Sequence, residues 1–194
     1  METNEHVLLC ILGKTASGKD FLTNKLCERT GFKPLISYTT RERRVNEGET
    51  HVFAIEEDFE QMLDMGEIAT FTQIGNNKYW VTFNQLYEAD CYIIDYLGLK
   101  RLKEHNLPGL RLVTVYINTP DAVREERALN QRKDDRAKFR ARSLAEREQF
   151  RDMLKNADFD YSISNIEWPK AYSVLRHISD IEGVWKNHLD YTTE

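Results

Sequence analysis

The apolar positions near the start of the chain predict a strand, a helix and a second strand. Residues 6–13 contain an unbroken run of six apolar residues, which is typical of a strand that is buried on both faces. Residues 18–30 have a helical pattern that ends at Gly31, and residues 33–40 predict the second strand. A helix between two strands forms a crossover, which makes the strands parallel. We therefore expect an α/β fold with a doubly wound parallel sheet as its core.

A smaller α+β segment is expected to interrupt this core. Its pattern predicts a polar loop, a short strand, a helix and a hairpin, in the order 41–48, 51–55, 56–65 and 68–81. Phe59, Met62 and Leu63 fall on one face of the predicted helix, which gives this segment a small apolar surface of its own.

The core is expected to resume with two buried strands, residues 91–95 and 110–117. The segment Thr119-Pro120-Asp121 is typical of a helix start, and the chain from there to about Asn156 has no strand pattern. Residues 160–164 predict a last short strand. Beyond Pro169, apolar side chains at helical spacing are expected to pack a closing helix against the core: Val174, Leu175, Ile178, Ile181, Trp185 and Leu189.

These patterns divide a single domain into three parts. At 194 residues with 41% hydrophobic content, the chain is long enough for one buried core with excursions. We expect an inserted α+β segment at residues 41–90 and an arginine-rich helical segment at residues 124–156. The core is expected to contain the remaining residues, 1–40, 91–123 and 157–194.

Composition argues against several classes of protein. The apolar runs are too short to cross a bilayer and the N-terminal segment is acidic, so we expect a cytoplasmic protein with no membrane partner. The net charge of −5 argues against binding of nucleic acid over a wide surface. Cys10, Cys27 and Cys91 are odd in number and far apart, which favours buried small side chains over a disulfide or a metal site.

The stretch between the first strand and the first helix reads Gly13-Lys14-Thr15-Ala16-Ser17-Gly18-Lys19-Asp20. Glycines allow the backbone to curl so that successive N–H groups point inward, and the helix N-terminus and Lys19 add positive charge. This order predicts a phosphate-binding loop for ATP, and a plain turn with two glycines is the simpler alternative. The residues expected to hold ATP are Gly13, Thr15, Ala16, Ser17, Gly18, Lys19, Asp20 and Phe21.

Two carboxylates are candidates for binding Mg²⁺. Asp20 stands where phosphate-binding loops usually carry a serine or threonine that holds the ion, and a carboxylate is also a hard oxygen ligand. Asp95 ends the strand at residues 91–95, where an acid can hold Mg²⁺ or its bound water. The alternative for Asp95 is a surface position at the end of a strand.

Arginines are concentrated in two places. Arg41 and Arg44 are three residues apart, a spacing that suits bidentate binding of a phosphate, with a basic loop paired to local acids as the alternative. Eight more arginines lie in residues 124–151 among interleaved acids, and most are expected to form ion pairs on a solvated helix face. The rest can close over reacting phosphates and spread their charge, and we favour Arg127, Arg132 and Arg142.

The order of these motifs resembles the guanylate kinase family over essentially the whole chain. Thr39-Thr40-Arg41 followed by Arg44, Glu47-Gly48 and Phe53 is similar to the family's acceptor-phosphate signature, and the segment from Phe159 to Asn165 falls in the family's order. The resemblance implies a P-loop core with a mobile acceptor-binding insert, residues 41–90, and a lid, residues 124–156. It also implies Mg²⁺-dependent transfer of the ATP γ-phosphoryl group to a nucleoside monophosphate, with GMP or dGMP first.

The resemblance implies roles for individual residues. Lys19 and the two groups of arginines would align and neutralise the phosphates, and Asn165 would lie near the adenine. The residues implied around the acceptor are Ser37, Tyr38, Arg41, Arg44, His51, Thr70, Tyr79 and Val81.

Some positions depart from the family where the acceptor is recognised. His51 stands in place of a tyrosine that helps to hold the acceptor phosphate, and Thr70 in place of an acid that reads guanine. Val81 replaces a serine, and Leu97 replaces a second acid after the core strand. We therefore expect a weak preference for guanine, with Glu67 as the alternative reader if the hairpin is shifted by one residue.

Three alternative functions follow from the same residues. Asp20 together with His51 resembles kinases of ribose 1,5-bisphosphate, whose acceptor has no base. An enzyme that acts on a nucleic-acid end or a modified nucleotide would share the donor site but need a wider acceptor cleft. A non-catalytic guanylate kinase-like binding module is the alternative of another class, although such modules typically lose the glycines and the lysine that are intact here. The sequence leaves the oligomeric state open.

Overall fold

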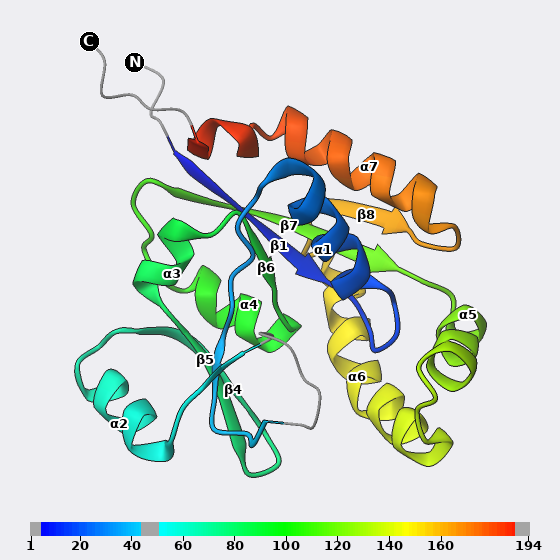
Figure 1. Ribbon diagram of the computed structural model, residues 1–194, viewed down its shortest axis with the longest axis horizontal. Coiled ribbons are helices and arrows are strands. Elements are labelled where there is room, and N and C mark those ends of the chain that lie inside the picture. Colours follow the sequence, from blue (N-terminus) through cyan, green and yellow to red (C-terminus); the bar gives the residue numbers. More distant parts are fainter. Residues whose placement is uncertain (1–4, 44–50, 189–194) are drawn as a thin grey trace.

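The computed structural model describes residues 5–43 and 51–188 (Figure 1). Its larger sheet has four parallel strands in the order β6-β1-β7-β8. The bounds of these strands are β1 (His6–Leu12), β6 (Cys91–Ile93), β7 (Leu110–Asn118) and β8 (Tyr161–Ser164). The four strands fall on four of the five stretches that the sequence predicts for the core, so the parallel α/β core is confirmed.

The central strand β1 belongs to two hydrophobic cores, because successive side chains of a strand point to opposite faces of the sheet. Leu8, Cys10 and Leu12 join the first core. Val7, Leu9 and Ile11 join the second core. This alternation explains why β1 is apolar at every position from Val7 to Leu12.

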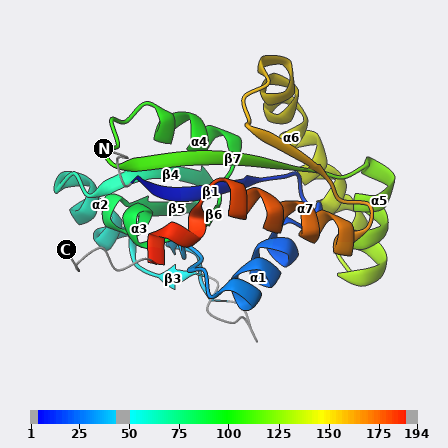
Figure 2. The same ribbon diagram turned by 90° about the horizontal axis from the view of Figure 1, so that it is seen from above.

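Helices cover both faces of the larger sheet. The first core includes side chains from α3 (Phe83–Glu88), α4 (Tyr96–Lys103) and α6 (Arg136–Asn156). The second core includes side chains from α1 (Lys19–Thr30) and α7 (Trp168–Ile181). Figure 2 shows α4 and α7 on opposite sides of the strands. The doubly wound arrangement is therefore confirmed, although the sequence analysis had not predicted α3 and α4.

A second, mixed sheet forms the inserted part of the molecule, with the strand order β3-β2-β5-β4. Its strands are β2 (Tyr38–Thr39), β3 (Val52–Phe53), β4 (Ile68–Ile74) and β5 (Asn77–Thr82). β4 and β5 form the predicted antiparallel hairpin, and α2 (Glu56–Asp64) precedes it. On α2, Phe59 is buried against Phe71 and Trp80, whereas Leu63 is exposed instead of packed.

The prediction of a core strand over residues 33–40 is wrong. Pro34 makes only an isolated parallel bridge to Cys91, and a proline has no N–H group with which to extend a ladder. Farther along, Tyr38 pairs with Val52 in a parallel register and with Trp80 in an antiparallel one. The chain therefore touches the edge of the core sheet at Pro34 and then enters the second sheet.

The arginine-rich stretch is helical, as expected, but it is not one continuous α-helix. α5 (Asp121–Glu126) leads directly into the π-helical turn η1 (Arg127–Gln131), and α6 follows after a short connection. Isolated π-helical turns are uncommon and occur frequently at functional sites. No helix in the described part of the chain is both long enough and apolar enough to cross a membrane.

The closing helix α7 packs on the core with only part of its apolar surface. Leu175 and Ile178 are buried, but Val174 and Ile181 are exposed. Trp185, in the following 3₁₀ helix η2 (Val184–His188), is also exposed, and Leu189 lies outside the described residues. The expectation that all these side chains pack against the core is therefore wrong for Val174, Ile181 and Trp185.

The three cysteines are free thiols, as the sequence predicts. Cys10 and Cys91 are buried in the larger sheet and Cys27 is half-buried on α1. Burial raises the pKa of the Cys10 thiol to about 12 because it disfavours the thiolate. These cysteines therefore serve as small core side chains.

Two neighbouring residues of α7 test this packing. Leu175→Ala should lower the free energy of unfolding by about 2–5 kcal/mol, because it removes a fully buried side chain and leaves a cavity. Val174→Ala on the exposed side should change it by less than about 0.5 kcal/mol. Urea denaturation followed by circular dichroism measures both values. Similar losses for the two variants would contradict the observed orientation of α7.

Candidate active site

The loop between β1 and α1 has a backbone that requires glycine at two positions. Gly18 caps α1 with φ +86°, and a Cβ atom there would lie 2.6 Å from Nδ2 of Asn165. A Cβ atom on Gly13 would lie 2.5 Å from Oγ of Ser17. Ala16 also has a left-handed backbone, with φ +60°. The loop is therefore a tight, curled segment that no other residue type at positions 13 and 18 fits without rearrangement.

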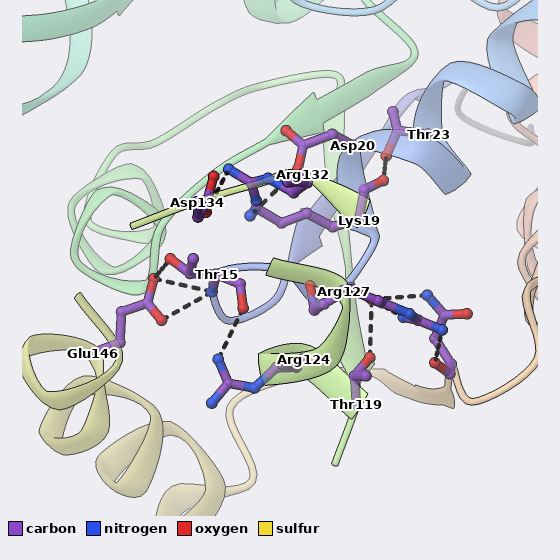
Figure 3. A network of polar contacts seen from close by, with 12 residues as sticks. Thr15, Lys19, Asp20, Thr23, Thr119, Arg124, Arg127, Arg132, Asp134 and Glu146 are labelled. Carbon is purple, nitrogen blue, oxygen red and sulfur yellow. Dashed lines mark hydrogen bonds and ion pairs between the residues drawn. The ribbon is translucent and has the colours of Figure 1, made fainter. Parts of the chain in front are cut away.

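Side chains from distant elements fix the carbonyl groups of this loop (Figure 3). The Ser17 carbonyl accepts hydrogen bonds from Oγ1 of Thr119 at 2.9 Å, Nδ2 of Asn165 at 2.8 Å and Nη1 of Arg127 at 3.2 Å. In a trans peptide the N–H group points opposite to the carbonyl group. The N–H of Gly18 therefore points away from these anchors, toward the N-terminal end of α1, where backbone N–H groups attract anions.

Arg124 is a structural arginine of the site that sequence reasoning missed. It is 3% exposed and donates hydrogen bonds to the Thr15 carbonyl at 2.8 Å and to the Asp121 carboxylate at 2.9 Å. The hydrogen bond from Arg124 lowers the pKa of Asp121. The signal in the sequence is that Arg124 lies three residues after Asp121 at a helix start, so the two side chains share one helix face.

The three favoured lid arginines have different partners. Arg127 donates to backbone carbonyls, those of Ser17, Asn165 and Ile166, and burial lowers the pKa of its guanidinium. Arg132 and Arg142 instead share the carboxylate of Asp134, at 3.3 and 3.4 Å.

A cavity of about 790 Å³ lies beside the loop and the lid. Gly18, Asp20, Arg127 and Arg132 contribute to its wall, as do Val123 of α5 and Gln131 of η1. Opposite them, the rings of Phe21 and Trp168 meet edge to face at 5.3 Å, and both rings are partly exposed. Flat, partly exposed rings beside a cationic loop suit a ligand that has both an aromatic ring and phosphates. Trp168 was not among the predicted site residues.

A second cavity, of about 160 Å³, lies between the two sheets. Its lining includes five of the predicted or candidate residues, Ser37, His51, Thr70, Tyr79 and Asp95. The Ser37 hydroxyl and Nδ1 of His51 are 3.0 Å apart, and the ring of His51 lies against that of Tyr79. Hydroxyl, imidazole and phenol groups thus meet at one end of this cavity.

The other predicted residues of this region have different positions. Tyr38 stacks on Trp80 and does not line the cavity. Val81 is fully buried, directly opposite Thr70 in the hairpin. The Thr70 hydroxyl donates to the Gly98 carbonyl at 3.2 Å. Neither position 70 nor position 81 therefore offers a carboxylate to a ligand.

The two arginines of the acceptor signature are only partly described. Arg41 donates to the Glu42 carbonyl at 2.8 Å, and its guanidinium lies 5.5 Å from the centre of the Phe53 ring. Arg44 and the segment Glu47-Gly48 lie outside the described residues. The phosphate fork of Arg41 and Arg44 therefore stays a prediction.

The two candidate metal ligands line different cavities, Asp20 the larger and Asp95 the smaller. The Asp20 carboxylate is 70% exposed and 3.6 Å from Nζ of Lys19, so its oxygens can reach an ion on a bound phosphate. The Asp95 carboxylate accepts from Gly98 N–H and from the Thr72 hydroxyl. Within residues 5–43 and 51–188, no three His, Cys, Asp or Glu side chains gather as a metal site. Asp20 fits Mg²⁺ better than Asp95 does.

The sequence matches the guanylate kinase family model over residues 5–181. This match covers most of the chain, including both sheets and the lid. The chain belongs to the guanylate kinase family. The predicted resemblance is therefore confirmed, and the curled loop after β1 lies within the matched residues.

Individual members of the guanylate kinase family are distant in sequence. The guanylate kinase of Chlamydia trachomatis serovar D is 30% identical over 181 residues, which are 88% of this chain and 85% of the relative. That of Wolbachia sp. subsp. Brugia malayi is 26% identical over 92% of this chain and 94% of its own length. The crystal structure of guanylate kinase from Anaplasma phagocytophilum superposes with a TM-score of 0.63 at 22% identity, over 92% of this chain and 87% of that one. This last likeness shows the shared fold.

Replacing Arg124 tests its structural role under the loop. Arg124→Met should lower the free energy of unfolding by about 1–3 kcal/mol, because the Thr15 carbonyl loses its charged donor. Arg140→Met is the control, since the side chain of Arg140 is 67% exposed, and it should cost less than about 0.5 kcal/mol. Thermal and urea unfolding measure both. Equal values would show that Arg124 does not support the loop.

Proposed function

We propose that this protein transfers the γ-phosphoryl group of ATP to a nucleoside monophosphate. The observation that carries the proposal is that the P-loop and the lid arginines line one cavity: Gly18 and Asp20 face Arg127 and Arg132 there. Phosphoryl transfer through a loose transition state needs alignment and neutralisation of charge rather than covalent chemistry. A loop of backbone N–H groups with arginine side chains on the wall of the same cavity meets that need.

The donor nucleotide is proposed to occupy the larger cavity. Its base would lie against the rings of Phe21 and Trp168, near Asn165, and its phosphates would enter the loop at the N-terminus of α1. Lys19 is half-buried at the start of α1 and supplies the cation for the terminal phosphates. The other loop residues predicted for ATP, from Gly13 to Ser17, give the loop its curvature.

Mg²⁺ is proposed as the metal ion, with Asp20 as its ligand in the chain, directly or through water. When bound, it would neutralise charge on the β- and γ-phosphates. Arg127 and Arg132 are the proposed catalytic arginines because both line the cavity, and Arg142 is linked to Arg132 through Asp134. An arginine in this role is commonly worth about 10³–10⁵ in rate.

The acceptor is proposed to bind in the smaller cavity. Ser37, His51 and Tyr79 would hold its phosphate there together with Arg41 and Arg44, whose forked guanidinium groups suit bidentate contacts. A site for guanine would offer acceptors to its N–H groups, but Thr70 donates its hydroxyl to Gly98 and Val81 is buried. These two positions support weaker recognition of guanine than the resemblance to the guanylate kinase family implies.

A second candidate acceptor is a phosphorylated sugar without a base, such as ribose 1,5-bisphosphate. It is favoured by the small volume of the acceptor cavity, about 160 Å³, and by the absence of a carboxylate at positions 70 and 81. The volume lies below the range of about 300–1,000 Å³ in which sites usually enclose whole organic ligands. Transfer to a nucleic-acid end needs a wider cleft and fits this cavity less well. A non-catalytic binding module is disfavoured because the glycines and lysine of the loop are intact.

Removal of the Lys19 cation tests the donor site. Lys19→Ala should abolish phosphoryl transfer, lowering turnover by at least about 10³-fold, because the terminal phosphates lose their mobile cation. The fold should stay intact, since Lys19 is the first residue of α1 and its ammonium group lies 3.6 Å from the exposed carboxylate of Asp20 rather than in a hydrophobic core. Coupled ATP-consumption assays and circular dichroism measure the two effects. Unchanged turnover would contradict the proposed function.

A screen of acceptors tests base recognition. ATP consumption should be measured with each nucleoside and deoxynucleoside monophosphate and with ribose 1,5-bisphosphate. We expect kcat/KM for GMP to exceed that for AMP by less than about 100-fold, since two unpaired polar groups would account for roughly that ratio. Thr70→Glu combined with Val81→Ser should raise the ratio, provided that thermal unfolding confirms a folded variant. A larger ratio in the unmodified protein would mean that another acid, Glu67 first, reads the base.

A further inference from the structure

The carboxylate of Glu146 on α6 is bound to the P-loop itself. The Thr15 N–H donates to its Oε1 at 3.1 Å and to its Oε2 at 2.9 Å. The Thr15 hydroxyl donates to Oε1 at 2.6 Å. Figure 3 shows the Glu146 side chain reaching from its helix to this end of the loop. All three hydrogen bonds therefore join Glu146 to one residue of the loop, Thr15, which lies 131 positions away in the chain.

This contact differs from the other acidic contacts of α6. Glu148 and Asp152 are exposed and approach only Arg151 of the same helix. Glu146 is half-buried and binds a backbone N–H group in the segment that is shaped to receive phosphates. A carboxylate on a backbone N–H makes the same kind of charge-assisted hydrogen bond as a phosphate oxygen. The chain thus holds one of its own anions on a phosphate-binding loop.

We infer that Glu146 is an internal competitor of the donor's terminal phosphate and thereby sets the affinity of the loop for ATP. The inference rests on the proposed function, because it assumes that the loop binds a nucleotide triphosphate. Two anions that share one donor group repel each other, and this repulsion is strong where water is partly excluded. Glu146 must therefore leave Thr15 before ATP fills the loop. If the Glu146 carboxylate stays in place, ATP binds against its electrostatic repulsion.

The contact also links the lid to the loop. Phe139 near the start of α6 packs with Ala16 and Ala128, and Phe150 near its end lies in the first core. Because both ends of α6 are anchored by apolar contacts, loss of the Glu146 contact does not detach the helix. Rotation of one side chain is sufficient to clear Thr15. The helix therefore stays in place while its carboxylate is exchanged for phosphate.

Neutralisation of the carboxylate at constant shape tests the inference. Glu146→Gln keeps an oxygen that can accept from Thr15 but removes the negative charge. We expect the Kd for Mg·ATP to fall about tenfold, which corresponds to about 1.4 kcal/mol. The Kd for ADP should fall less, because it carries one phosphate fewer to be repelled. Isothermal titration calorimetry with both nucleotides measures these changes, and Glu148→Gln is the matched control that should leave both values unchanged.

A second variant approaches the same contact from the loop. Thr15→Val removes the hydroxyl that donates to Glu146 and keeps the backbone N–H and the side-chain shape. It should also tighten ATP binding, but less than Glu146→Gln does, because the backbone N–H at position 15 still binds the carboxylate. The two effects should not add, because both variants weaken the same contact. Unfolding midpoints of all variants confirm that each is folded.

The outcomes separate this inference from the proposed function. If ATP binds and binding depends on Lys19, but Glu146→Gln leaves the Kd unchanged or raises it, then Glu146 is a structural tie and the competitor role is wrong. If neither the unmodified protein nor any variant binds ATP, the proposed function itself fails. Additive effects of the two variants would also overturn the inference.

Discussion

The carbonyl oxygen of Ser17 is the point on which the phosphate-binding loop depends. It accepts hydrogen bonds from Thr119 after β7, from Arg127 in the lid and from Asn165 after β8. Each donor comes from a different element, so the loop reaches its curled shape only when these elements are in place. Gly18 completes the constraint, because Asn165 leaves no room for a side chain there. The loop is therefore a product of the assembled core rather than of a local turn.

The position of both cavities follows from the parallel sheet. Parallel strands bring their carboxyl ends to one edge, and ligands of open α/β sheets bind at that edge. The P-loop follows β1 and Asp95 follows β6, while Thr119 and Asn165 follow β7 and β8. The second sheet adds Ser37, Thr70 and Tyr79 to the smaller cavity. One part of the molecule thus supplies the loop, and another shapes the proposed acceptor site.

The arginines of α5, η1 and α6 have different roles, according to how deeply each side chain is buried. Arg124 is buried and supports the Thr15 carbonyl, while Arg127 binds carbonyls beside the larger cavity. Arg132 and Arg142 share Asp134, and arginines farther along α6 are exposed in weak surface pairs. Ion pairs of the exposed kind contribute little to stability. The π-helical turn between α5 and α6 begins with Arg127 and is followed by Arg132, the two arginines that line the larger cavity. The position of this turn therefore affects the cavity more than the number of arginines does.

From the sequence alone, the strands of the parallel core, the hairpin and the family could be predicted, because each depends on neighbouring residues or on motifs in a fixed order. Apolar runs identify strands that are buried on both faces, and glycine spacing identifies the curled loop. Tertiary structure decided that Tyr38 and Thr39 join the second sheet, since Pro34 cannot continue a ladder with β6. It also decided that Arg124 supports the loop and that Glu146 reaches Thr15. These contacts join residues more than a hundred positions apart, and only the tertiary packing that places α5 and α6 beside the loop brings their charges to it.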